Sequence, residues 1–276
     1  YDIKGDKLVK REVVELDVSG ASTSVEGLLG DQIGDLLLIN DNDLSYAKVR
    51  LDERSISTLK THLGKIDEDL TRSLLWAIIW DMLRDAELSA TDFVDILLSA
   101  IEAETNISVV TTLGGQLQSA IEVYASPKNR DILRNKAAAK IYEVLKASKA
   151  GGDFQLQFTK VFASLAAKED APKLQAILNG ELAGLVVDLD MRWLLTNSLV
   201  ERGALGIADL DAELAKDNSL SAQLSHAFGI AALPTVEAKN AAWKKITKED
   251  MTSAFREKTL HGFMRTTQRE LLSQWI

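Results

Sequence analysis

The stretch SATDFVDILLSAI at residues 89–101 predicts a helix with one buried face. Its first residue, Ser89, is followed three positions later by Asp92, a spacing similar to a capping box, in which both side chains satisfy free N–H groups at a helix start. Behind this start, apolar residues recur at i, i+3, i+4, i+7 and i+8, the spacing of one helix face. These residues are Phe93, Ile96, Leu97, Ala100 and Ile101.

The same helical pattern extends outward from this stretch, from about residue 52 to the end of the chain. The three prolines, Pro127, Pro172 and Pro234, fall at or near the starts of helical runs, where proline is tolerated. We expect short connections between helices of about 10–20 residues. The predicted helices span residues 55–63, 67–86, 89–104, 106–125, 127–149, 153–167, 170–179, 189–202, 207–216, 218–229, 235–246, 248–262 and 266–275.

Consecutive amphipathic helices with short links favour a mainly α fold built from stacked helix pairs. The segment at 67–86 is apolar almost all round, so neighbouring elements should cover it on several sides. No strict repeat motif can be read from the sequence. We therefore predict an α-α superhelix of degenerate, HEAT-like helix pairs.

Residues 1–51 have a different character, because five of the sixteen glycines fall there and the pattern has a period of two. We expect strands within 9–16, 36–39 and 44–51, with a polar turn at 40–43. Three strands are too few to close a sandwich, so residues 1–51 are predicted to be the end of an incomplete β-sandwich domain, followed by a helical domain over 52–276. The chain begins with Tyr1, from which we expect it to be cut from a longer protein.

Composition excludes several classes of function. The chain has no Cys, which removes disulfides, thiolate metal sites and thiol nucleophiles and suits a reducing, cytoplasmic location. The net charge of −9 argues against a nucleic-acid binder, and no apolar run approaches the length of a membrane span.

Charge is unevenly distributed along the chain. Residues 1–126 carry a net charge of −12 (11 basic, 23 acidic) and 127–276 carry +3 (21 basic, 18 acidic). The basic helix predicted at 127–149 is interpreted as a solvated face, with a partner-binding patch as the alternative.

A search for catalytic and metal-binding motifs finds none. His62, His226 and His261 each lack a second His within one helical turn, so the His-Glu-x-x-His zinc motif is absent. The Asp41-Asn42-Asp43 run lacks the Gly and Glu that a calcium-binding loop needs, and a turn explains it better. Asp188 and Asp190 stand at a helix start, where carboxylates cap free N–H groups. We therefore predict no catalytic and no metal-binding residue in this chain.

Four stretches resemble the zinc aminopeptidase N family, especially its actinobacterial members. LLLINDNDLSYAKVRLD (36–52) is similar to the passage from β-sandwich to helical domain in that family. LLWAIIWDMLRDAELSATDFV (74–94), DMRWLLTNSLVERG (190–203) and ELAKDNSLSAQLSHAFGIAALPTVEAKNAAW (213–243) resemble helices of its endoplasmic-reticulum-aminopeptidase-like C-terminal domain. The likeness covers nearly the whole chain in the order of the family.

The resemblance implies a non-catalytic helper role. In the family, a separate catalytic domain carries His-Glu-x-x-His, a further Glu that binds zinc, and a Gly-x-Met-Glu-Asn element, and none of these occurs in this sequence. The chain is then expected to hold no cofactor, with zinc in the catalytic domain of the parent enzyme. The helical domain would wall off a chamber over the active site and control the access of peptides. Its expected partners are that catalytic domain and peptide substrates, with no nucleic acid and no membrane.

Two points stay open in the sequence. Arg192 and Trp193 lie beside the apolar stripe of their helix, where they either face such a chamber or form a buried structural pair, so the substrate-binding residues are unknown. The alternative function is an independent α-solenoid scaffold that binds another protein. A free-standing hydrolase with scattered site residues is the third possibility. Because the chain lacks the catalytic motif of the family, it is predicted to be inactive alone.

Overall fold

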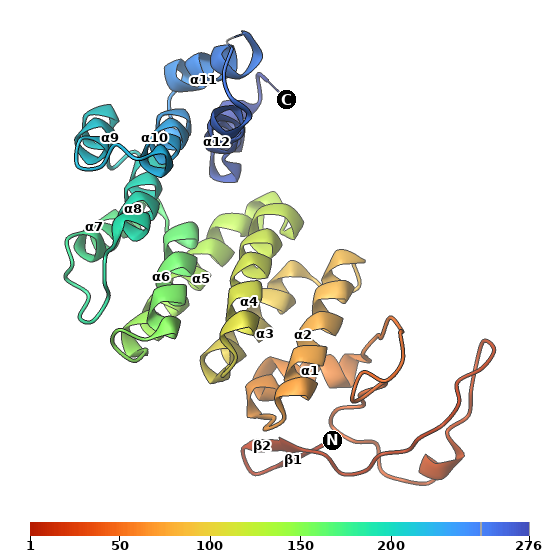
Figure 1. Cartoon of the computed structure of the whole chain (residues 1–276). Helices are drawn as coiled ribbons and strands as arrows, with labels where there is room; N and C mark the ends of the chain where they lie inside the picture. Colours follow the sequence, from red (N-terminus) through yellow and green to blue (C-terminus); the bar gives the residue numbers. More distant parts are fainter. Residues whose placement is uncertain (249, 276) are drawn as a thin grey trace. The chain divides into compact units, whose positions relative to one another are not determined.

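Figure 1 shows the computed structural model of the chain, which describes residues 1–248 and 250–275. Over these residues the chain forms thirteen α-helices and one two-stranded sheet, divided between two compact units, Tyr1–Asn129 and Arg130–Ile276. The predicted mainly α fold class is confirmed. The helices are α1 (Glu53–His62), α2 (Asp69–Arg84), α3 (Ala90–Ala100), α4 (Ile107–Ser119), α5 (Pro127–Ala147), α6 (Asp153–Leu165), α7 (Ala171–Leu178), α8 (Leu189–Glu201), α9 (Ile207–Leu214), α10 (Leu220–Ala232), α11 (Val236–Lys248), α12 (Ser253–Phe263) and α13 (Arg269–Leu272).

In the first unit, α3 is the central helix and packs against α1, α2, α4 and the π-helical turn Ala120–Tyr124. Its predicted cap is confirmed, because the Ser89 side chain accepts from the backbone N–H of Asp92 at 3.0 Å. Its apolar face is buried as predicted, with Phe93 fully covered and its ring centroid 5.5 Å from that of Trp80. Burial of such side chains supplies most of the stability of a short helix.

A buried polar network ties α2 of the first unit to the turn after α3. Arg72 on α2 donates to Glu104 at 3.1 Å and to the backbone carbonyl of Ile66 at 2.8 Å. The indole of Trp76 donates to the second carboxylate oxygen of Glu104 at 2.9 Å. Arg72 and Glu104 are both almost completely buried, so each charge depends on the other for its stabilisation.

The strands predicted within the first 51 residues are mostly absent. The two observed strands, β1 (Asp2–Lys4) and β2 (Lys7–Val9), form a small antiparallel hairpin, and the predicted strands at 36–39 and 44–51 and all of 9–16 except Val9 have no regular secondary structure. A strand needs a neighbour to pair its N–H and C=O groups, and the described residues supply none for these segments. The predicted domain boundary between residues 51 and 52 stays a prediction.

In the second unit, α10 is the central helix. It contacts α8, α9, α11 and α12, while α8 also packs against α6 and α7. Packing between neighbouring helices within each unit is the arrangement that the predicted helix-pair stacking requires. Two glycines allow the closest approaches: a Cβ at Gly229 would collide with the Asn197 side chain on α8, and one at Gly262 on α12 would collide with the Phe228 carbonyl on α10.

Two cations, the buried Lys239 and the half-buried Arg202, close helix ends in the second unit. Arg202 donates to the carbonyls of Ala163 and Ala166 at 3.0 and 2.5 Å, at the C-terminal end of α6. Lys239 on α11 donates to the carbonyls of Ala231, Gly262 and Phe263 at 2.7–3.2 Å, at the ends of α10 and α12. Cations stabilise the negative ends of helices, so these two residues join neighbouring helices through their last turns. Burial lowers the pKa of Lys239 to about 8.

Helix boundaries follow the sequence predictions closely except near the C-terminus. Apart from the last two helices, each predicted start lies within two residues of an observed start. The predicted helix 248–262 begins later, at Ser253, because Thr252 is its cap, whereas the Thr247 hydroxyl lies inside α11 and donates to the Trp243 carbonyl at 2.8 Å. Thr247-Lys248-Glu249-Asp250 has the spacing of a capping box in the sequence, but Glu249 lies outside the described residues. The predicted helix 266–275 is a 3-10 turn followed by the short α13.

A glycine closes the C-terminal end of α8. Gly203 adopts a positive φ of 71°, and its N–H donates to Val200 O at 2.9 Å while the N–H of Ala204 donates to Leu199 O at 2.9 Å. This pair of bonds is the Schellman motif, which needs a residue without a Cβ penalty at Gly203. None of the helices in the described part of the chain has the length and apolar character needed to cross a membrane.

Candidate functional site

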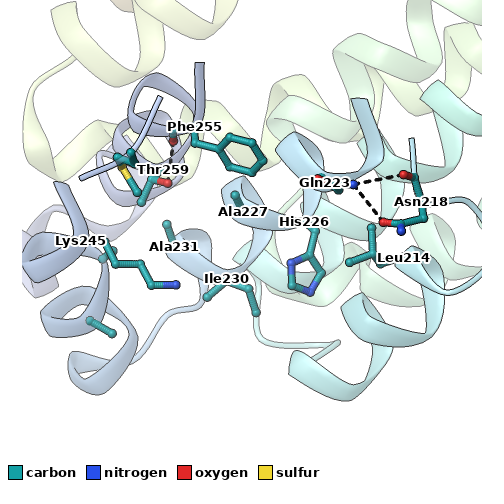
Figure 2. A pocket seen from close by; sticks show the side chains of 13 residues that line it. Leu214, Asn218, Gln223, His226, Ala227, Ile230, Ala231, Lys245, Phe255 and Thr259 are labelled. Carbon is teal, nitrogen blue, oxygen red and sulfur yellow. Dashed lines mark hydrogen bonds between the residues drawn. The ribbon is translucent and has the colours of Figure 1, made fainter. Parts of the chain in front are cut away.

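A cleft of about 420 Å³ lies in the second unit, between α10, α11 and α12 and beside the connection from α9 to α10. Figure 2 shows its side chains. One part of its lining is apolar and comprises Leu214, Ala227, Ile230, Ala231, Ala241, Ala242, Met251 and Phe255. The polar part comprises Asn218, Gln223, His226, Lys245 and Thr259. A mixed lining of this kind is typical of ligand sites, in which apolar contacts give area and a few polar groups fix orientation.

Local interactions hold the polar side of the cleft in place. Ser219 caps α10 by accepting from the N–H of Ala222 at 3.2 Å, which is the usual role of Ser before a helix. One turn later, the amide of Gln223 donates to both the backbone and the side-chain oxygen of Asn218, at 3.1 and 3.0 Å. Figure 2 shows this pair at one side of the cleft. The position of the Gln223 side chain is therefore fixed by its own helix start.

Charge in the cleft is one-sided. Lys245 on α11 has no hydrogen-bond or ion-pair partner among the described residues, and Figure 2 shows its side chain extending into the cleft. Nε2 of His226 lies 2.8 Å from the Asp211 carboxylate on α9. No Asp or Glu is among the residues that line the described cleft, although the chain has 41 acidic residues. The cleft therefore offers positive charge without a carboxylate of its own.

The structure separates the roles of Arg192 and Trp193. Trp193 is only 3% exposed and belongs to a core cluster with Val200 and Leu210, which is the structural role that the sequence left open. Arg192 forms two hydrogen bonds to the buried carboxylate of Glu213, at 2.6 and 2.8 Å, and Lys216 adds a third at 2.7 Å. The hydrogen bond from Arg192, with help from Lys216, lowers the pKa of Glu213 to about 2.

The three histidines lie on separate helices, with His62 at the end of α1, His226 on α10 and His261 on α12. Nδ1 of His62 lies 2.8 Å from the Thr61 hydroxyl, which is a local contact. Within residues 1–248 and 250–275, no three His, Asp or Glu side chains are grouped so that they could hold a metal ion. The side chains of the described residues therefore do not form a donor set that fits a zinc site. The prediction that zinc belongs to another domain is not tested by this observation and stays a prediction.

The acidic runs noted in the sequence have local structural roles. Residues 40–43 form a turn in which Asn40, Asn42 and Asp43 adopt positive φ values of 60°, 72° and 54°. The Asp41 carboxylate accepts from the Tyr1 hydroxyl at 2.9 Å and lies 2.9 Å from the Lys10 ammonium. Asp188 caps α8 by accepting from the N–H of Met191 at 2.9 Å. The turn and helix-start interpretations are both confirmed.

A comparison with known families agrees with the fold. The profile of the ERAP1-like C-terminal domain matches residues 36–276. The chain belongs to the ERAP1-like C-terminal domain family. It is also 40% identical over 280 residues to a protein named Aminopeptidase N from Streptomyces lividans, and the match covers 100% of this chain and 33% of that protein. The chain thus spans about a third of the length of this relative, and the resemblance to the C-terminal domain of the aminopeptidase N family is confirmed.

Sequence reasoning missed the cleft of this ERAP1-like C-terminal domain. Gln223 and His226 lie in the stretch 213–243 that carries part of the family resemblance, but no motif marks them. Lys245 and Phe255 come from two further helices. A cleft of this kind depends on how three helices pack, and the spacing of residues along one helix gives no signal for it. The excess of small residues on α10 and α11 is the one local hint, because alanines leave room between helices.

Proposed function

We propose that this chain is the non-catalytic C-terminal domain of a zinc-dependent aminopeptidase N, in which it walls a chamber over the active site and controls the access of peptides. The proposal is carried by one observation: the family profile matches 36–276, and the whole chain is 40% identical to a third of an aminopeptidase N. Such a domain removes no amino acid itself. The active site and the peptide would lie against its surface.

The composition of the chain supports a parent enzyme in which catalysis and the selection of substrates belong to different domains. The sequence has no His-Glu-x-x-His motif, and its three histidines stand on three different helices. In the parent enzyme, zinc bound to the catalytic domain would polarise the scissile carbonyl and activate water. The residues of this chain would act on the substrate by position only, by excluding folded proteins and admitting extended peptides.

The packing of the second unit suits a wall that must keep its shape. Lys239 holds the ends of α10 and α12 with three hydrogen bonds, and Arg202 does the same at the end of α6. Close packing at Gly229 and Gly262 leaves little room for these helices to shift. Lys239, Gly229 and Gly262 are buried, and the guanidinium of the half-buried Arg202 is occupied by backbone carbonyls, so these residues support the wall and would not themselves contact a peptide.

The expected partners belong to the same proposal, namely the catalytic domain of the parent enzyme and peptide substrates. We also place the protein in the cytoplasm, since a chain with no Cys is suited to a reducing compartment. Fractionation of the source cells, with detection of the chain by an antibody, tests the location. Recovery outside the cytoplasm would remove this part of the proposal and leave the rest standing.

A domain exchange tests the role of the chain. The matching third of the Streptomyces lividans aminopeptidase N is either deleted or replaced by this chain, and hydrolysis of alanine p-nitroanilide is compared with hydrolysis of a ten-residue peptide and of a folded protein substrate. Replacement is expected to preserve the preference for peptides over the folded protein, and deletion is expected to abolish that preference. If the deleted enzyme discriminates among the three substrates as the intact one does, the proposed role is wrong.

A further inference from the structure

We propose that the cleft between α10, α11 and α12 binds an amphipathic carboxylate, a molecule that joins an apolar group to a carboxylate. The proposal rests on the chemistry of the cleft and not on the function proposed above. Its volume of about 420 Å³ lies within the range of small-molecule sites in proteins, which is about 300–1,000 Å³.

The apolar part of the cleft has room for one aromatic or branched aliphatic group. Four alanines, at 227, 231, 241 and 242, leave space between the helices, and the larger side chains of Ile230, Met251 and Phe255 border that space. Figure 2 shows Phe255 and Ile230 on different sides of the opening. A ring in this space would exchange water for apolar contacts on several sides, which favours binding.

The charge of the cleft selects the polar end of the ligand. Lys245 extends into the cleft from α11 and has no partner among the described residues, so its ammonium group is available to an anion. None of the described residues that line the cleft carries a carboxylate to receive a positively charged group. A free amino terminus would therefore find no counter-charge in the cleft, whereas a carboxylate would find Lys245.

The polar wall opposite Lys245 adds fixed groups. Nε2 of His226 lies 2.8 Å from the carboxylate of Asp211, a residue that does not line the cleft, so this ring nitrogen already has a partner. The Gln223 amide nitrogen is already engaged by Asn218. Because the Gln223 amide nitrogen and Nε2 of His226 are already engaged, Lys245 is the main anchor of the anion.

Titration with a matched pair of ligands tests the site on the full 276-residue chain. The probes are 3-(4-fluorophenyl)propanoate and its neutral amide of the same shape, each followed by fluorine NMR. The acid is expected to bind saturably with a Kd on the order of 1 mM, as its size allows. The amide should bind about fivefold more weakly, because it lacks the charge that Lys245 attracts. Equal affinity of acid and amide, or no saturable binding of the acid, would overturn the proposal.

Two lysine variants locate the charge. Lys245→Met keeps the apolar stem and removes the ammonium group, so it should weaken acid binding about fivefold and leave amide binding unchanged. Lys244→Met is the matched control, because Lys244 is an exposed neighbour on α11 that does not line the cleft. The proposal is wrong if both variants bind the acid equally well. Thermal melting by circular dichroism confirms that both variants fold.

A variant that fills the cleft locates the apolar group. Ala241 is exposed at the rim, so Ala241→Leu is expected to block the cleft and abolish binding of both ligands without unfolding the chain. Undiminished binding to this folded variant would place the ligand elsewhere and overturn the proposal. If the variant does not fold, the Lys245 comparison decides.

The same chemistry occurs in free aromatic acids and at the ends of peptides, and a third titration distinguishes these sources. An acetylated tripeptide, Gly-Gly-(4-fluoro)Phe, is compared as the free acid and as the amide. Tighter binding of the peptide acid than of the small acid identifies a peptide end as the ligand, and equal affinity identifies a free acid. Binding of neither acid contradicts the site altogether.

Discussion

Helix α3 and the first 46 residues lie in the same unit, yet the apolar side chains of α3 are mostly buried and many of those in the first 46 residues are exposed. In α3, seven of eleven residues are buried, and Phe93 and Ile96 are completely covered. Of the twenty large apolar side chains exposed in the described residues, ten belong to residues 3–46, including Leu29, Leu44 and Tyr46. Both regions have an apolar pattern. The difference is that a helix satisfies its own backbone hydrogen bonds, whereas an extended segment needs a neighbour to pair with.

The first 51 residues are nevertheless attached to the helices at defined points. Leu36 is buried, and the N–H of Leu37 donates to the Ser55 hydroxyl at 3.0 Å. The Thr58 hydroxyl on α1 donates to the Asp35 carbonyl at 2.7 Å. The comparison therefore teaches that this region is held at separate points, which are residues 35–37, Asp41, the β1–β2 hairpin and residues 48–51, while ten of its large apolar side chains stay exposed.

The largest expected effect is in the interior of α3. Phe93→Ala should lower the free energy of unfolding by about 4 kcal/mol, since it removes a fully buried ring that contacts Trp80 and leaves a cavity. Urea unfolding followed by circular dichroism measures it. A loss below about 1 kcal/mol would mean that α3 is not the core of its unit, and the contrast drawn above would fail.

A somewhat smaller effect is expected from the buried ion pair of the same unit. Arg72→Met leaves the Glu104 carboxylate buried with only the Trp76 indole as a side-chain partner and should cost about 3 kcal/mol. The double variant Arg72→Met, Glu104→Gln removes the uncompensated charge, so it should recover part of that loss. If the double variant is less stable than the single one, the unpaired charge is not the cause.

The pH dependence of stability tests a buried carboxylate of the second unit. The pKa of Glu213 is about 2 in the folded chain, against an ordinary value of 4.5, so its stabilising contribution is complete above pH 4.5 and is lost as the pH falls toward 2. Between pH 6 and pH 2.5, the wild-type chain should therefore lose about 2 kcal/mol more than Glu213→Gln. Glu12→Gln, at an exposed position in the first 51 residues, is the control for the loss of one negative charge. Equal losses in the wild type and in Glu213→Gln would show that the Arg192 contact does not form.

The smallest effect is expected among the exposed side chains of the first 46 residues. Leu44 is 80% exposed, so Leu44→Ala should change the free energy of unfolding by no more than about 0.5 kcal/mol. The same urea experiment measures it beside Phe93→Ala. A loss above about 1 kcal/mol would reveal that this region is packed in solution, and the contrast with α3 would then need revision.

The helices could be predicted from the sequence because their signals are local. Ser89 and the apolar spacing behind it specify α3, and Gly203 marks the end of α8. The strands could not, since alternation within 9–16 and 44–51 indicates extended chain but cannot supply a partner. The start of α12 was misplaced because Thr247 and Thr252 both resemble caps, and only packing decides between them.

The candidate site was beyond sequence reasoning for a related reason. Lys245 and Lys239 lie on the same helix and look alike in sequence, yet one extends into the cleft and the other is completely buried against three carbonyls. Whether each lysine side chain is buried or extends into the cleft depends on how α10 and α12 pack against α11. The spacing of residues along α11 does not encode that packing. The family resemblance, by contrast, could be read from the sequence, because it depends on long stretches and not on single positions.

The central claim, that this chain is a non-catalytic domain, is tested most directly by assaying the pure 276-residue chain with alanine p-nitroanilide, with and without added zinc. We predict no hydrolysis above the protein-free rate in either case and no stoichiometric binding of zinc to the chain. Zinc-dependent hydrolysis that scales with the concentration of the chain and survives further purification would contradict the account.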